Sequence, residues 1–124
     1  MILRKFSNLC SAALFALLVT SAAAGAHAIV TGTSMNGQPL AANRVAEVEL
    51  HFNSAVEFNF VRVFLINVKG QETRLVVKAG KTRDAIFIQI PLLKPGAYAL
   101  RYRLLAVDGH FTDNLLRFAV SEPK

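Results

Sequence analysis

Few side chains in this sequence can bind a metal ion or react, and the most informative of them are three histidines and one aspartate. The histidines are His27, His51 and His110, and Asp108 begins an Asp-Gly-His triplet that ends at His110. Residues i and i+2 of an extended segment project to the same side, so Asp108 and His110 are predicted to converge on one point. Asp-Gly is also a common hairpin dipeptide, and the alternative interpretation is a plain turn with His110 as a bystander.

The residues before His27 have the pattern of a secretory signal peptide. Arg4 and Lys5 precede an apolar run centred on residues 12–19, and small residues fill positions 21–26. A basic start, an apolar centre and a small-residue end are typical of a leader that is removed on export. We therefore expect a signal peptide over residues 1–26 and one mature domain over residues 27–124.

Two cleavage sites are compatible with this leader, and they differ in what they do to His27. Cleavage after Ala26 makes His27 the first residue, whereas cleavage after Ala28 discards it; the first follows the apolar run more closely and is the one we expect. The alternative is a retained anchor, because residues 7–30 carry no charge and are long enough to span a bilayer. Cys10 precedes the apolar run and is not placed for lipidation.

An N-terminal His27 would offer two nitrogen ligands, its α-amine, with a free pKa of about 7.7 to 8.0, and its imidazole Nδ1. The His110 imidazole adds a third nitrogen and the Asp108 carboxylate an oxygen. Tetragonal coordination by nitrogen and oxygen donors suits Cu(II). His27, Asp108 and His110 would therefore offer a ligand set suited to one Cu(II) ion per chain, and the residues alone leave this site and the plain turn as open alternatives.

His51 is interpreted differently because of the pattern around it. It shares the polar face of a predicted strand with Glu47 and Glu49, opposite an apolar face. A solvated or cross-strand-paired role is expected there, and His51 is left outside the site.

The remaining composition argues against other chemistries. The mature chain would have 98 residues with 12 basic and 8 acidic side chains and no cysteine, so its fold must rest on a hydrophobic core. The mean hydropathy of +0.40 comes largely from the leader. No Gly-rich phosphate loop or nucleophile elbow is present, and the basic residues are scattered along strand patterns. Neither a nucleic acid nor a small-molecule substrate is expected as a partner.

Strand-period patterns dominate the mature chain and are separated by Gly and Pro turns. The expected strands lie at residues 45–52, 60–66, 74–78, 85–90, from 97 to 104, and 114–120. In the fifth of these, Tyr98, Leu100, Tyr102 and Leu104 are expected to face the core. Several short strands at this spacing predict an all-β fold, a small antiparallel sandwich or barrel with Greek-key connections.

Taken together, these features resemble the CopC family of periplasmic copper-binding proteins. The shared segments are the His at the mature N-terminus, Val-Glu-Leu-His-Phe at 48–52, Pro-Gly-x-Tyr-x-Leu-x-Tyr at 95–102, Asp-Gly-His at 108–110 and Phe-x-Val at 118–120. The resemblance implies an immunoglobulin-like or cupredoxin-like barrel of about seven strands and a Cu(II) site at His27, Asp108 and His110. It also implies a periplasmic location and a CopD-like inner-membrane protein as partner.

Three departures from the family pattern bear on the site. Met35 is the only methionine of the mature chain, so the Met-rich Cu(I) site of some members is not expected. Ser54 stands where some members place a Glu near Cu(II). That extra carboxylate is therefore missing here unless Glu57 supplies it. Residues 34–37 replace a loop in which the family usually has Pro before Gly.

The function expected from these observations is non-enzymatic: a copper carrier for resistance, storage or delivery to an inner-membrane transporter. One alternative is an immunoglobulin-like interaction module without metal, which would apply if cleavage removed His27. The other is a histidine-brace copper oxygenase. Such an enzyme needs an open coordination position, which Asp108 would fill, and commonly an aromatic substrate surface, whereas this sequence has no Trp.

Overall fold

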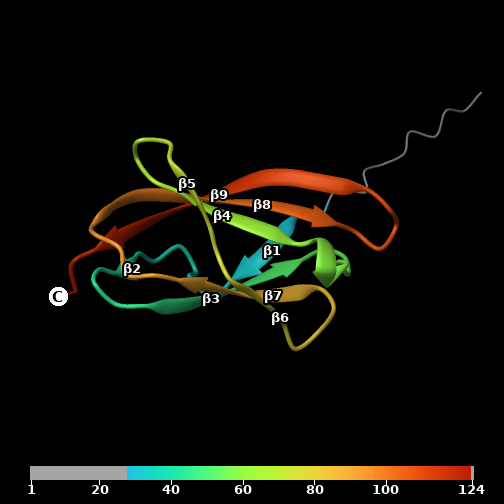
Figure 1. The fold of residues 1–124 in the computed structure, drawn as a ribbon. Coiled ribbons are helices and arrows are strands. Elements are labelled where there is room, and N and C mark those ends of the chain that lie inside the picture. Colours follow the sequence, from blue (N-terminus) through green and yellow to red (C-terminus); the bar gives the residue numbers. More distant parts are fainter. Residues whose placement is uncertain (1–27, 124) are drawn as a thin grey trace, which may run out of the picture.

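Alternating apolar and polar residues fold this chain into two β-sheets packed face to face (Figure 1). The structure, a computed structural model, describes residues 28–123; the predicted leader and His27 lie outside that range. The strands are β1 (Val30–Thr33), β2 (Leu40–Ala41), β3 (Ala46–Phe52), β4 (Arg62–Ile66), β5 (Glu72–Arg74), β6 (Val77–Ala79), β7 (Ala85–Ile90), β8 (Gly96–Leu105) and β9 (Phe111–Ser121), and a short 3-10 helix spans Phe58–Phe60.

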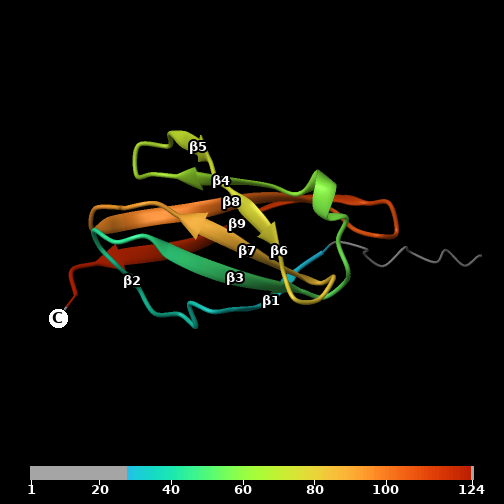
Figure 2. The same ribbon diagram turned by 60° about the horizontal axis from the view of Figure 1, so that its bottom comes forward.

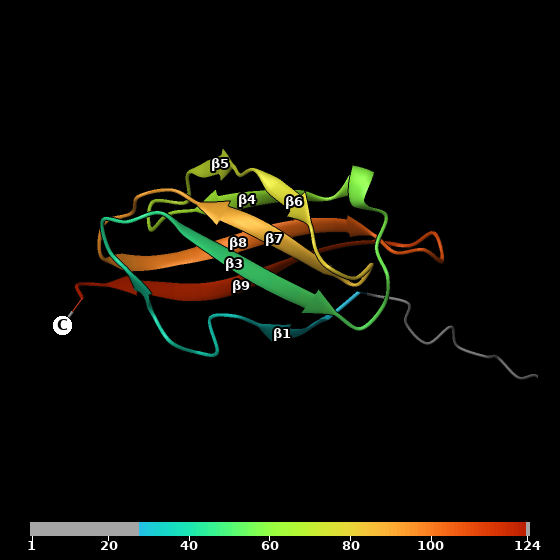
Figure 3. The same ribbon diagram turned by 90° about the horizontal axis from the view of Figure 1, so that it is seen from below.

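One sheet has four strands in the order β1-β3-β7-β6, and the other has five in the order β2-β9-β8-β4-β5. Figure 2 and Figure 3 show the two layers from other sides, with the β8–β9 hairpin as the longest element. The predicted all-β sandwich is confirmed. Within residues 28–123 there are nine strands rather than about seven: the sequence pattern did not indicate β1 or the two-residue β2, and β5 and β6 divide one expected strand.

The prediction of one strand over residues 74–78 is wrong. β5 ends at Arg74 in one sheet and β6 begins at Val77 in the other. Between them, the Leu75 amide donates to the Val63 carbonyl at 2.9 Å, and the Val76 carbonyl accepts from the Gln89 amide at 3.0 Å. The chain thus crosses from one sheet to the other within two residues, while Leu75 and Val77, two positions apart, both pack against the core.

Two predicted boundaries also shift. β9 begins at Phe111, not at 114, and residues 58–60 form the 3-10 helix instead of the first part of β4. No helix among the described residues is long and apolar enough to cross a membrane.

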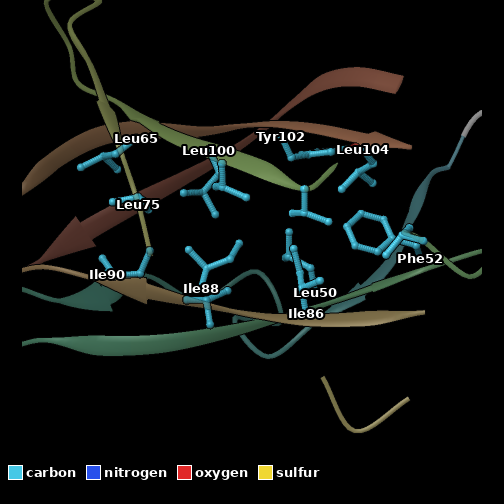
Figure 4. Packing of buried hydrophobic residues seen from close by; sticks show 14 of the residues in the cluster. Leu50, Phe52, Leu65, Leu75, Ile86, Ile88, Ile90, Leu100, Tyr102 and Leu104 are labelled. Atoms are coloured by element: carbon cyan, nitrogen blue, oxygen red, sulfur yellow. The ribbon is translucent and has the colours of Figure 1, made fainter. Parts of the chain in front are cut away.

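The core lies between the two sheets (Figure 4). Leu100 and Leu104 of β8 are fully buried, Tyr102 is nearly so and Tyr98 is half-buried against the core, which confirms the predicted inward face of that strand. The Phe52 and Tyr102 rings lie with their centroids 5.7 Å apart and join the two sheets. The side chains with the least exposure come from both sheets: Val48, Leu50, Val63, Ile86, Ile88, Leu100 and Leu104.

Because this core must support the fold, Leu100→Ala is expected to lower the free energy of unfolding by about 2 to 5 kcal/mol. Leu100 has no exposed surface, and its strand neighbours Leu65 and Leu116 also pack in the core. The matched control is Leu115→Ala on the other side of the sheet, where Leu115 is 43% exposed; a change of about 1 kcal/mol or less is expected. Urea denaturation of the mature chain measures both, and equal losses would contradict this assignment of the core.

Candidate metal centre

The Asp-Gly-His triplet forms the turn between β8 and β9. The Ala106 amide donates to the His110 carbonyl at 3.0 Å, and the Gly109 amide donates to the Ala106 carbonyl at 2.9 Å. Gly109 has a φ of 95°, in the left-handed region that side chains with a Cβ rarely adopt. The plain-turn interpretation of the triplet therefore describes its backbone correctly.

The same turn brings the Asp108 and His110 side chains together. Asp108 Oδ1 accepts a hydrogen bond from the His110 amide at 3.1 Å and lies 3.3 Å from His110 Nδ1. The predicted convergence is confirmed, but its local cause is a hairpin turn and not an extended segment. The two side chains remain 47% and 64% exposed, so an ion can reach them from solvent.

The chemistry of this pair suits a metal ion. The His110 backbone N–H, chiefly, and the imidazole beside it hold the pKa of the Asp108 carboxyl below its usual range, so the carboxylate is charged at neutral pH. Two donors bound to one metal ion at about 2.0 Å and at right angles lie about 2.8 Å apart. The 3.3 Å between Oδ1 and Nδ1 is close to that separation, so both atoms can bind one ion after a small adjustment.

The first described residue is anchored beside this turn. The Ala28 amide donates to Thr112 Oγ1 at 3.0 Å, and Ala28 is only 1% exposed. The next residue is fixed as well, since the Ile29 amide donates to Asn53 Oδ1 at 2.9 Å and the Asn53 amide donates to the Ile29 carbonyl at 3.0 Å. Residues 28 and 29 are therefore fixed, and Ala28 contacts β9 at Thr112, which is two residues after His110 in the sequence.

Sequence reasoning missed this anchor. Thr112 sits at an inward position of β9, paired with Leu104, and is 7% exposed. A threonine among inward apolar positions was the available signal, because a buried hydroxyl needs a hydrogen-bond partner. Its partner, Ala28, is 84 residues away in the sequence.

His27 itself lies outside the described residues, so its part in the site stays a prediction. Within residues 28–123 no group of three or more His, Cys, Asp or Glu side chains could hold a metal ion. A metal ion bound to Asp108 and His110 would therefore find no third ligand of these types beside them within the described residues.

The loop after β3 lies against the turn. The Glu57 amide donates to the Leu105 carbonyl at 2.8 Å, and the Val107 amide donates to the Ala55 carbonyl at 3.2 Å. The Glu57 carboxylate is 3.7 Å from the Arg83 guanidinium, so it already has a cationic neighbour.

The structure gives the other two residues considered from the sequence contacts of their own. His51 is 44% exposed, which confirms the solvated interpretation, and its Nε2 lies 2.9 Å from Glu49 Oε1 on the same strand and not across to a neighbouring one. Met35 belongs to the hydrophobic core and is 7% exposed.

In a comparison with known proteins, residues 30–121 match the model of the CopC domain family. Among curated proteins, Protein YobA of Escherichia coli K12 is 28% identical over 107 residues, which cover 84% of this chain and 85% of that protein. Among solved structures, CopC from Methylosinus trichosporium OB3b has a TM-score of 0.68 and 21% identity over 79% of this chain and 97% of its own. PcoC, a methionine-rich copper resistance protein from Escherichia coli, has a TM-score of 0.59 and 19% identity over 77% of this chain and 100% of its own.

Proposed function

The chain belongs to the CopC family, and on that premise we propose that it is a periplasmic protein that binds one Cu(II) ion as its cargo. The ligands are the amine and imidazole of His27, the Asp108 carboxylate and the His110 imidazole. The observation that carries the proposal is the Asp108–His110 pair on a turn beside which Ala28, the residue after His27, is anchored to Thr112. The copper resistance named for PcoC, a relative in fold, supports copper as the ion.

Three nitrogens and one oxygen in a tetragonal arrangement favour Cu(II) over Zn(II), which prefers a tetrahedral set. With Asp108 as the fourth ligand, protein groups would fill the four equatorial positions, which favours holding the ion over activating a substrate at it. The proposed role is therefore to store copper or pass it to an inner-membrane transporter of the CopD kind, in copper resistance or copper homeostasis, without catalysis.

The test begins with the exported protein. Intact mass determination establishes whether the chain begins at His27, and a competition titration at neutral pH then compares Cu(II) with Zn(II). Retention of one equivalent of Cu(II) in the presence of excess Zn(II) is expected. A chain that begins at His27 and still prefers Zn(II), or binds neither ion, would refute the proposal.

Binding is expected to release protons and to weaken as the pH falls. The Asp108 carboxyl has a lowered pKa, so it remains ionised well into the acidic range and does not limit binding near neutrality. Protons instead compete for the nitrogen ligands, of which the α-amine has a free pKa of about 7.7 to 8.0. Titrations at several pH values with a chelator of known affinity measure the effect, and affinity that stays constant from pH 8 to about pH 5 would contradict nitrogen ligation.

A further inference from the structure

The outer face of the five-stranded sheet is rich in arginine. Directly paired residues of antiparallel strands project to the same face, so the register defines its rows. One row contains Arg62, Arg103 and Asp113; the next contains Arg74, Phe64, Arg101 and Leu115; the third contains Glu72, Ile66, Ala99 and Arg117. Among the described residues, five arginines and two carboxylates give this surface, here called the arginine face, a formal charge of +3.

Both carboxylates of the arginine face are engaged by a single arginine. Arg101 Nη2 lies 2.8 Å from Asp113 Oδ2, and Arg101 Nη1 lies 3.1 Å from Glu72 Oε1. Within residues 28–123, the other four arginines of this face form no salt bridge, and Arg62 donates instead to the backbone carbonyls of Asn59 and Val61. Arg103 lies opposite Asp113 in the register and helps to lower the pKa of that carboxyl, while the charges of the other three are available to an anionic partner.

Exposed aromatic rings adjoin these arginines. Phe60 and Phe111 are 51% and 52% exposed, and their rings meet edge to face with centroids 6.5 Å apart. The Arg103 guanidinium lies 5.3 Å from the centroid of the Phe111 ring. Cationic groups and apolar rings thus share one surface, and basic residues together with Phe, Trp or Leu are the combination by which interfacial elements bind the headgroup region of a bilayer.

The opposite sheet has the other sign of charge. Its register places Glu47, Glu49 and His51 on the outer face of β3, with Lys78 of β6 on the same side. Taking His51 as neutral, that face has a formal charge of −1 among the described residues. The two outer faces of the sandwich therefore have opposite formal charge. An extended anionic surface would orient the molecule with the arginine face toward that surface.

We infer that the arginine face binds the surface of an anionic bilayer, with guanidinium groups on lipid phosphates and the Phe60 and Phe111 rings among the headgroups. The arginines are spread over four neighbouring strands rather than gathered around one pocket. A bilayer presents phosphate everywhere beneath such a surface, whereas a protein partner would need a matching expanse of carboxylates. Since Phe111 follows His110, the Asp-Gly-His turn would lie at the margin of the bound surface. A role of bilayer binding in placing the copper site near the membrane rests on the proposed copper function, whereas the binding itself does not.

The test is co-sedimentation of the chain that begins at His27 with vesicles of phosphatidylcholine containing about 30% phosphatidylglycerol, compared with phosphatidylcholine alone. Binding to the anionic vesicles only, and its loss as salt rises from about 0.05 to about 0.5 M, is expected. The double variant Arg74→Gln/Arg117→Gln should bind about 10- to 30-fold more weakly. The control Arg44→Gln/Lys78→Gln removes the same charge outside the arginine face and should bind within about threefold of the parent chain.

Cu(II) titration of the same samples separates this inference from the proposed function. Intact Cu(II) binding without vesicle binding overturns the lipid assignment and leaves the copper proposal standing, and the reverse result does the opposite. Equal loss in both double variants would reduce the effect to net charge and overturn the assignment. Binding to polyglutamate but not to anionic vesicles would assign the arginine face to an acidic protein instead.

Discussion

A chain that begins at Ala28 is expected to bind Cu(II) about a thousandfold or more weakly than the chain that begins at His27. Removing groups that merely orient metal ligands costs about 10- to 100-fold in affinity, and this truncation removes two of the four proposed ligands themselves. Asp108 and His110 would remain as an exposed pair without a third His, Cys, Asp or Glu neighbour in residues 28–123. Competition against a chelator of known Cu(II) affinity measures the difference.

Truncation also converts the Ala28 amide into a charged amine, which changes its hydrogen bond to Thr112. The control is His27→Ala, which keeps both a terminal amine and the Ala28 amide and removes only the imidazole. This variant should unfold at the same urea concentration as the parent chain while losing most of the Cu(II) affinity. If either variant bound Cu(II) within tenfold of the parent chain, the ion would have to be held elsewhere.

The sequence predicted the sandwich because its long strands have a regular alternation. In β8 the predicted inward residues Leu100, Tyr102 and Leu104 are buried, since one face of a two-layer sheet must be apolar. The crossing at Leu75 and Val76 could not be predicted in this way, because a short run of apolar residues fits one continuous strand as well as a change of sheet.

The candidate site was predictable to the extent that it is local. Asp108 and His110 are two residues apart, so either an extended segment or a turn brings their side chains close, and the structure has the turn. The anchoring of Ala28 on Thr112 joins the first described residue to β9, a contact set by the whole fold and not by any local pattern. That contact is what gives the predicted role of His27 its structural support.

His110→Ala is expected to reduce Cu(II) affinity about 100- to 1,000-fold with almost no loss of stability. The His110 side chain is 64% exposed, so removing it leaves no cavity, and a change within about 0.5 kcal/mol in the free energy of unfolding is typical of such sites. Two hydrogen bonds of the turn do not require the imidazole. The Ala106 amide donates to the His110 carbonyl, and the His110 amide donates to Asp108 Oδ1. Electron paramagnetic resonance of the Cu(II) form should show one nitrogen ligand fewer.

The matched control is His51→Ala, which removes an imidazole of comparable exposure from β3 and leaves Glu49 without its 2.9 Å partner. Cu(II) affinity should be unchanged in this variant because His51 lies outside the site. The pair of variants also separates the proposed carrier from a metal-free interaction module, in which His110 is only part of a turn. A module predicts that His110→Ala and His51→Ala behave alike toward Cu(II), whereas the proposed site predicts that only the loss of His110 releases the ion.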